Sequence, residues 1–317
     1  MAHHHEGHDH AGHGHSHLPS GVGDGAILIA VIVNLGLTVA QIAGGYIADS
    51  TALIADGVHN LSDAMALVLA FGARRLARRP ASPAMSFGWS RAEIIAAFVN
   101  YIALIAVSVW LGIEALGRLF DPPQVQGGLV MALAALALVI DLATAALVWR
   151  ASRESVNIRA AFLHNLADAA VSVAVIFGGL LIWAFGWQIA DPILTLAISV
   201  VIMWHVVREL SPVMRMLMLA APDGVDHQAV EESLRAVPGI DSVHHIHMWQ
   251  IDEHRTALSA HLVMGPDADA PGAVRLAKAM LRRDFGIDHA TIETERQGDP
   301  CGDHAHEHDD HAAHDHH

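Results

Sequence analysis

The chain of 317 residues is strongly apolar, with 53% of its residues hydrophobic and 16% charged. An ordinary soluble domain carries about 25% charged residues, so the composition argues against both a soluble enzyme and a disordered chain. The formal net charge is −15, from 18 basic and 33 acidic residues. Phosphate binding requires a basic patch, so this balance argues against a nucleic-acid partner and favours a cationic substrate.

Six apolar segments predict six transmembrane helices, because about 20 apolar residues span a bilayer as a helix. The predicted spans are residues 25–46, 52–74, 91–117, 127–149, 158–184 and 188–210. Residues 1–24 are polar and His-rich, and they lack the basic and apolar regions of a cleaved signal peptide. We therefore expect a His-rich N-terminal tail over 1–24 and a transmembrane domain over 25–210.

The arginines between the predicted spans fall mostly on one side of the bundle. That side carries Arg74, Arg75, Arg78, Arg79, Arg91, Arg150, Arg153 and Arg159. Before the sixth span ends, the other side offers only Arg118. Cytoplasmic connections are enriched in Lys and Arg, so the pattern predicts a multi-pass protein of the cell inner membrane with both termini in the cytoplasm.

Residues 211–296 change in character and predict a small cytoplasmic domain. Asp226 can cap a helix that ends before Pro238, and the later periodic segments are Ser242–Ile251, Thr256–Met264, Ala270–Phe285 and Ala290–Glu295. Their patterns alternate between strand and helix, which gives the order αββαβ of a two-layer α+β domain. Residues 297–317 form a His-rich C-terminal tail that cannot bury a core.

Ionisable residues inside the second and fifth spans point to a metal site. The second span holds His59 and Asp63, and the fifth holds His164 and Asp168. A separation of four residues puts each pair on one helical face, and ionisable residues in membrane helices are costly and usually functional. Two such helices facing each other would bring two imidazoles and two carboxylates together. The alternative is simple pairing between packed helices, but the repetition of the motif favours a metal.

The predicted ligand set suits a particular kind of ion. Four N and O ligands favour tetrahedral Zn²⁺, with Co²⁺, Cd²⁺ and Ni²⁺ as lesser candidates, whereas Mg²⁺ and Ca²⁺ require more oxygens. Two carboxylates neutralise one divalent cation when both histidines are neutral. Once emptied, the site would leave two poorly solvated carboxylates, so metal and protons should compete for it. Asp56, before this motif, could be an outer ligand, a residue on the metal's path or a helix cap.

The sequence contains neither a His-Glu-x-x-His motif nor a Walker-type Gly-x4-Gly-Lys motif. The first absence disfavours a zinc protease and the second disfavours ATP as the energy source. We therefore expect no enzyme activity. A metal site in the membrane without a nucleotide site favours a secondary transporter with protons as the counter-ion.

These features resemble the cation diffusion facilitator family, especially its bacterial zinc-exporting branch. The resemblance covers about residues 20–300 and is carried by the segments Ser50–Asp63, Ser86–Glu93, Asn157–Asp168 and His244–Trp249. It implies a homodimer of six-helix protomers in the lipid bilayer, a ferredoxin-like cytoplasmic domain, and export of divalent metal against protons. It also implies a Zn²⁺ transport site at His59, Asp63, His164 and Asp168.

The same resemblance implies a regulatory metal at His244, His261 and Glu295 in the cytoplasmic domain, with Glu293 as a further acid. Strand alternation alone does not decide which face His244 shares with these residues, and ordinary surface histidines are the alternative. Cys301 could add a thiolate or be a bystander. Eight histidines within residues 1–17 and seven within 304–317 are expected to collect metal loosely.

The leading hypothesis is therefore a Zn²⁺ exporter that exchanges the metal for protons by alternating access. One alternative is a broader exporter of Co²⁺, Ni²⁺ or Cd²⁺. A second alternative, from another class, is a membrane metal sensor whose site locks a dimer without flux.

Overall fold

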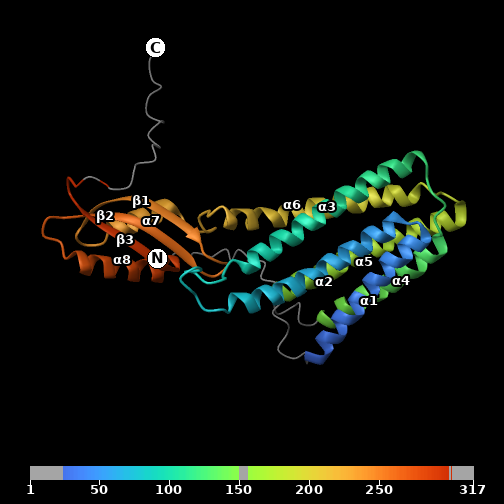
Figure 1. Cartoon of the computed structure of the whole chain (residues 1–317), viewed down its shortest axis with the longest axis horizontal. Helices are drawn as coiled ribbons and strands as arrows, with labels where there is room; N and C mark the ends of the chain where they lie inside the picture. Colours follow the sequence, from blue (N-terminus) through green and yellow to red (C-terminus); the bar gives the residue numbers. More distant parts are fainter. Residues whose placement is uncertain (1–23, 150–155, 300, 302–317) are drawn as a thin grey trace, which may run out of the picture. The chain divides into compact units, whose positions relative to one another are not determined.

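The computed structural model describes residues 24–149, 156–299 and 301. The chain divides into two compact units, Met1–Met214 and Arg215–His317 (Figure 1). The first unit is helical, and the second contains the only sheet among the described residues. The His-rich segments expected to collect metal lie outside the described residues.

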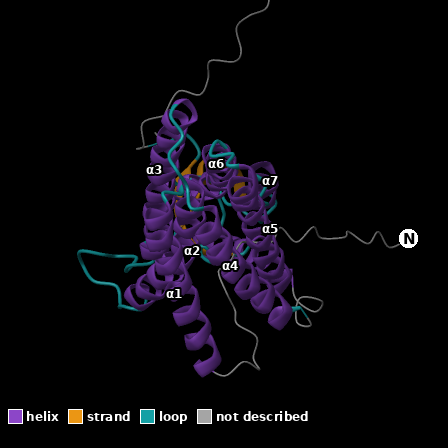
Figure 2. Ribbon diagram, turned by 90° about the vertical axis from the view of Figure 1, so that its right-hand side faces the viewer, coloured by secondary structure: helices purple, strands orange, loops and turns teal. Residues whose placement is uncertain are grey.

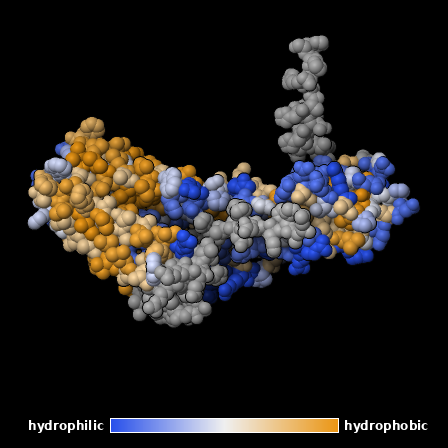
Figure 3. Space-filling model, turned by 180° about the vertical axis from the view of Figure 1, so that it is seen from behind, coloured by the Kyte–Doolittle hydropathy of each residue, from blue (hydrophilic) through white to orange (hydrophobic). Residues whose placement is uncertain are grey.

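Among the described residues, the first unit consists of long helices, drawn in purple in Figure 2. They are α1 (Asp24–Ala48), α2 (Thr51–Ala77), α3 (Ala92–Phe120), α4 (Gly127–Val148), α5 (Val156–Phe185) and α6 (Ala190–Leu217). Within the described residues, α2 to α6 each contain a stretch long and apolar enough to cross a membrane, and Ile32–Ala48 of α1 is a shorter apolar helix. Hydrophobic residues cover much of the visible face of this unit (Figure 3). The prediction of a multi-pass α-helical membrane domain is confirmed.

The helix ends follow local chemistry. The side chain of Ser50 accepts a hydrogen bond from the Leu53 amide at 3.1 Å and so caps the first turn of α2. The end of α6 differs from the prediction, because this helix continues beyond residue 210 to Leu217 with Pro212 inside it. Proline has a helical φ of about −65°, so it removes one backbone hydrogen bond without ending the helix.

Close backbone approaches join α4 to α5 and α1 to α2. A Cβ added at Gly127 on α4 would lie 2.5 Å from the carbonyl oxygen of Gly179 on α5. On the other pair, a Cβ at Gly45 would lie 3.1 Å from the backbone nitrogen of Ile54. Only glycine allows backbones this close. The bundle therefore contains two tightly packed helix pairs, and α2 and α5, which carry the predicted ligands, belong to different pairs.

The second unit has the predicted order αββαβ. Its elements are α7 (His227–Arg235), β1 (Ile240–Gln250), β2 (Thr256–Met264), α8 (Ala270–Phe285) and β3 (Ile287–Arg296). The sheet order is β1-β2-β3, with β2 antiparallel to β1 and parallel to β3. Fully buried leucines from α7, β2 and α8 form its core: Leu234, Leu258, Leu262 and Leu281. The small α+β domain is confirmed.

Two details of this sheet differ from the regular strands that the sequence predicts. Gly286 adopts φ +66° and ends α8, so β3 begins at Ile287, three residues before the predicted start. In β1, the register shifts between His244 and His247, and His245 has φ +50°. A bulge of this kind changes which side chains share a face.

Candidate metal centres

The helices α2 and α5 bring together all four residues predicted for the membrane site. Nε2 of His59 lies 3.3 Å from Oδ1 of Asp168, and Nε2 of His164 lies 3.2 Å from Oδ2 of Asp63. Each histidine thus faces the carboxylate of the other helix. Within each helix the His–Asp distances are 3.8 Å on α2 and 3.5 Å on α5.

These separations fit a tetrahedral metal. Zinc bonds to N and O ligands are about 2.0–2.2 Å long, so neighbouring ligands in a tetrahedron lie about 3.3–3.6 Å apart. The four measured His–Asp distances run from 3.2 to 3.8 Å. Ligand atoms of His59, Asp63 and Asp168 all lie within 4.8 Å of one another, and His164 contacts both carboxylates. The arrangement can hold one small divalent cation, with two anionic ligands balancing its charge.

The site has a buried half and a more open half. The side chains of His59 and Asp168 are 14% and 10% exposed, whereas those of Asp63 and His164 are 40% and 41% exposed. Nδ1 of His59 is buried and has no hydrogen-bond partner among the described residues. Its Nε2 is therefore the nitrogen directed at the carboxylates.

Asp56 lies next to this site without joining it through a described contact. It is 1% exposed, and Nε2 of Gln41 on α1 donates to its Oδ2 at 2.5 Å. Asn60 in turn donates to Oε1 of Gln41 at 3.0 Å. The cap of α2 is Ser50, so the helix-cap role considered for Asp56 is wrong. Asp56 instead fixes α2 against α1.

Two buried carboxylates in the membrane unit were not singled out by the sequence analysis. Asp141 on α4 is 6% exposed and accepts a hydrogen bond from Ser172 at 3.3 Å. Ser172 lies four residues after Asp168, on the same face of α5. Asp191 at the start of α6 is 1% exposed. A lone acid in an apolar span is a signal that the sequence does contain.

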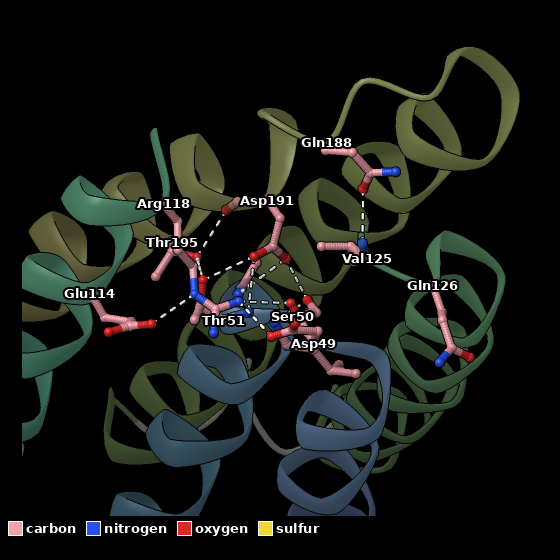
Figure 4. Close-up of polar contacts among 12 residues, drawn as sticks. Asp49, Ser50, Thr51, Glu114, Arg118, Val125, Gln126, Gln188, Asp191 and Thr195 are labelled. Carbon is pink, nitrogen blue, oxygen red and sulfur yellow. Dashed lines mark hydrogen bonds and ion pairs between the residues drawn. The ribbon is translucent and has the colours of Figure 1, made fainter. Parts of the chain in front are cut away.

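Asp191 connects the first turns of α6 and α2 (Figure 4). Its carboxylate accepts hydrogen bonds from the Thr51 amide at 2.9 Å, the Ala52 amide at 3.3 Å, and the hydroxyls of Ser50 and Thr51. An anion at a helix N-terminus satisfies amides that have no partner within the helix and interacts favourably with the helix dipole. Asp191 thus positions the helix that carries His59 and Asp63.

The second unit brings together the three residues predicted for the cytoplasmic site. His244 on β1 pairs with His261 on β2 across the antiparallel ladder. Glu295 on β3 contacts both of them, with Oε1 2.8 Å from Nδ1 of His261 and Oε2 3.3 Å from Nε2 of His244. Glu293 lies 3.7 Å from Nε2 of His261 and is 63% exposed. The bulge also places the rings of His245 and His261 5.2 Å apart, which alternation did not predict.

Cys301 belongs to the same cluster. Its Sγ lies 3.4 Å from Nδ1 of His261, and ligand atoms of His244, His261, Glu295 and Cys301 all lie within 4.8 Å of one another. Burial raises the pKa of Glu295, but hydrogen bonds from His261 and Cys301 outweigh this effect and hold that pKa below its ordinary value. The carboxylate is therefore ionised and available as a ligand at neutral pH.

Both units match models of known protein families. The cation efflux transmembrane domain matches residues 27–218, and the cytoplasmic domain of cation efflux proteins matches residues 222–297. Similar proteins include zinc transporter ZitB of Escherichia coli, 34% identical over 90% of this chain and 91% of that protein. The metal cation efflux system protein CzcD of Cupriavidus metallidurans is 32% identical over 92% of each chain.

A third relative is the cadmium, cobalt and zinc/H(+)-K(+) antiporter of Bacillus subtilis, 30% identical over 93% of this chain and 94% of that protein. Among solved structures, the metal-bound C-terminal domain of the CzcD transporter is 33% identical, covering 22% of this chain and 99% of that chain with a TM-score of 0.22. The two domain matches together cover most of the chain. This membrane protein therefore belongs to the cation efflux family, the cation diffusion facilitators, whose bacterial zinc exporters are among its relatives.

Proposed function

We propose that this protein exports Zn²⁺ from the cytoplasm in exchange for protons by alternating access. The observation that carries the proposal is the convergence of two imidazoles and two carboxylates from α2 and α5, at separations of 3.2–3.8 Å. The relatives are named as zinc transporters, a metal cation efflux protein and a cation antiporter. These names support metal efflux, and the proton exchange is our inference from the site.

Charge balance within the site supports an exchange with protons. Zn²⁺ bound to two carboxylates and two neutral imidazoles forms a neutral group. Without the metal, one proton can be shared between His59 and Asp168 and another between His164 and Asp63, because each pair is within hydrogen-bonding distance. With two protons bound, the site is therefore as neutral as it is with one Zn²⁺ bound. Neutrality matters because a net charge inside a bilayer is costly.

In the proposed cycle, the site changes access in both directions as a neutral group, first with Zn²⁺ bound and then with two protons bound. Cytoplasmic Zn²⁺ replaces the two protons, and the loaded site becomes accessible from the other side. Protons from that side then displace the metal, and the protonated site returns. We place both termini in the cytoplasm, with tails over 1–24 and 297–317, a transmembrane domain over 25–210 and a cytoplasmic domain over 211–296.

The cytoplasmic domain is proposed to assist in two ways. The chain is expected to work as a homodimer, which the match to the family's cytoplasmic domain supports. His244, His261 and Glu295 are proposed to hold a regulatory Zn²⁺ that stabilises the active form. This second metal would be resident, in contrast to the transported ion.

A broader divalent-metal exporter is the second candidate. The printed name of the B. subtilis relative includes cadmium and cobalt, and two of the four membrane ligands are carboxylates that accept several divalent ions. The two histidines favour Zn²⁺ within that range. Competition between Zn²⁺, Cd²⁺, Co²⁺ and Ni²⁺ for uptake would rank these ions directly.

The test is zinc uptake into proteoliposomes that contain a zinc dye and have a more acidic interior. We expect zinc entry that rises with the pH difference and that, at low zinc concentration, is strongly reduced in Asp168→Asn. Entry that ignores the pH difference would contradict the proton exchange. A folded protein that binds zinc but gives no entry would favour the sensor over the transporter.

A further inference from the structure

We propose that Cys301 is the fourth ligand of the cytoplasmic metal site, which thereby becomes a His₂-Glu-Cys centre with a bound thiolate. The inference rests on the proposed regulatory metal at His244, His261 and Glu295, and it adds a residue from beyond the last strand. The metal class that it predicts is Zn²⁺ or another thiophilic divalent ion.

The distances around Cys301 fit a metal ligand. Zinc bonds are about 2.3 Å long to sulfur and about 2.0–2.1 Å long to nitrogen, so S and N ligands in a tetrahedron lie about 3.5–3.6 Å apart. Sγ of Cys301 is 3.4 Å from Nδ1 of His261, and Nε2 of His244 is 3.3 Å from Oε2 of Glu295. Glu293 is less suitable, because it faces the other ring nitrogen of His261.

The chain after β3 turns back towards the sheet, which brings Cys301 to the cluster. The Asp299 amide donates to the carbonyl of Arg296 at 3.0 Å, and the Arg296 amide donates to the Asp299 side chain at 3.2 Å. Gly298, with φ +90°, allows this turn. Without it, a strand continuing in the direction of β3 would carry Cys301 away from His261.

Charge also favours a thiolate at this position. With His244, His261 and Glu295 alone, a bound Zn²⁺ keeps a net charge of +1. A metal deprotonates a coordinating thiol, and the Cys301 thiolate then makes the centre neutral. His261 is 6% exposed, so the compensation takes place where solvent screens charge poorly.

The thiolate provides a direct spectroscopic test, because Cys301 is the only cysteine in the sequence. Co²⁺ bound to a thiolate shows an intense near-ultraviolet charge-transfer band, whereas imidazole and carboxylate ligands do not. Co²⁺ titration of the full-length reduced protein in detergent should therefore give this band. It should be absent in Cys301→Ser, and zinc should compete for the site.

His261→Ala separates this centre from the His-rich tails. If Cys301 binds metal with His261, the band is lost in His261→Ala and zinc no longer slows the reaction of Cys301 with maleimide. A band that persists in His261→Ala would mean that the tail binds the metal, and the proposal would be wrong. Visible Co²⁺ bands in the parent without the charge-transfer band would also overturn it.

The contribution of Cys301 can be measured as a change in the zinc affinity of the cytoplasmic site. Loss of an outer hydrogen-bond partner of a metal ligand costs roughly 10- to 100-fold in affinity, so Cys301→Ser should cost at least that much. Zinc flux measured on the same preparations separates this inference from the proposed transport. Parent protein that transports zinc but lacks the thiolate band refutes the role of Cys301 alone, whereas absence of flux refutes the transport.

Discussion

The two carboxylates of the membrane site should differ in how much their charge contributes to zinc binding. Asp168→Asn and Asp63→Asn each keep the shape and one oxygen of the side chain but remove a negative charge. The side chain of Asp168 is 10% exposed and that of Asp63 is 40% exposed. We expect the more buried substitution to be more damaging.

The magnitude follows from the cost of an uncompensated charge. Removing one partner of a buried ion pair costs about 3–5 kcal/mol, and each 1.4 kcal/mol is about tenfold in affinity. Asp168→Asn should therefore weaken zinc binding by about 10²- to 4 × 10³-fold. Exposed ion pairs are worth only about 0–1 kcal/mol. The cost of substituting the partly exposed Asp63 should therefore fall between the value for an exposed pair and the value for a buried pair. Its substitution should cost about tenfold less than that of Asp168.

The zinc concentration dependence of proteoliposome uptake measures this difference. The control is Asp121→Asn, which removes the same charge from an exposed position after α3 and should leave the apparent KM unchanged. Size-exclusion chromatography checks that each variant is folded. An unchanged KM in Asp168→Asn, or a larger loss in Asp63→Asn, would refute the assignment of the buried half of the site.

Three further predictions test other parts of the structure. His59→Asp and His164→Asp should each keep some zinc uptake and gain Cd²⁺ or Mn²⁺ uptake with a changed pH profile, since replacing an imidazole by a third carboxylate makes the site less selective for zinc. Competitive metal uptake at several pH values is the measurement. Asp191→Ala should lower the melting temperature in detergent more than Asp191→Asn, because each buried donor left unpaired costs about 1–3 kcal/mol. Deleting residues 1–17 and 303–317 together should weaken apparent zinc affinity modestly and spare maximal flux, because these tracts bind metal only loosely.

Each of these three predictions has an outcome that contradicts it. Parental selectivity and pH profile in both histidine variants would mean that these imidazoles do not touch the metal. Equal melting temperatures for the parent and Asp191→Ala would show that the bonds to α2 contribute nothing to stability. Complete loss of flux after the tail deletion, at unchanged expression, would assign the tails a part in transport itself.

The grouping of the four residues proposed as membrane ligands could be predicted in part from the sequence because they obey helical periodicity. His59 and Asp63 are four residues apart, as are His164 and Asp168, and this spacing fixes their common face without any tertiary information. What periodicity does not provide is the pairing of the two helices. The cross-helix contacts of 3.2 and 3.3 Å depend on how α2 and α5 meet.

The cytoplasmic cluster was harder to predict because it depends on departures from regular structure. Regular alternation would put the neighbours His244 and His245 on opposite faces, but His245 has φ +50° and both rings lie within 5.3 Å of His261. Cys301 follows a turn after the last strand, where no periodic signal exists. The buried acids Asp141 and Asp191 are a different case, because each was visible as an acid in an apolar span.

The packing of the bundle also bears on how a bound metal could matter to the proposed cycle. Glycines allow α4 to lie close to α5 and α1 to lie close to α2. His59 and Asp63 belong to one of these pairs, and His164 and Asp168 to the other. A metal held by all four side chains would therefore connect two closely packed helix pairs. When protons replace the metal, weaker hydrogen bonds replace the metal bonds between α2 and α5. We expect the change of access to occur between these two helices.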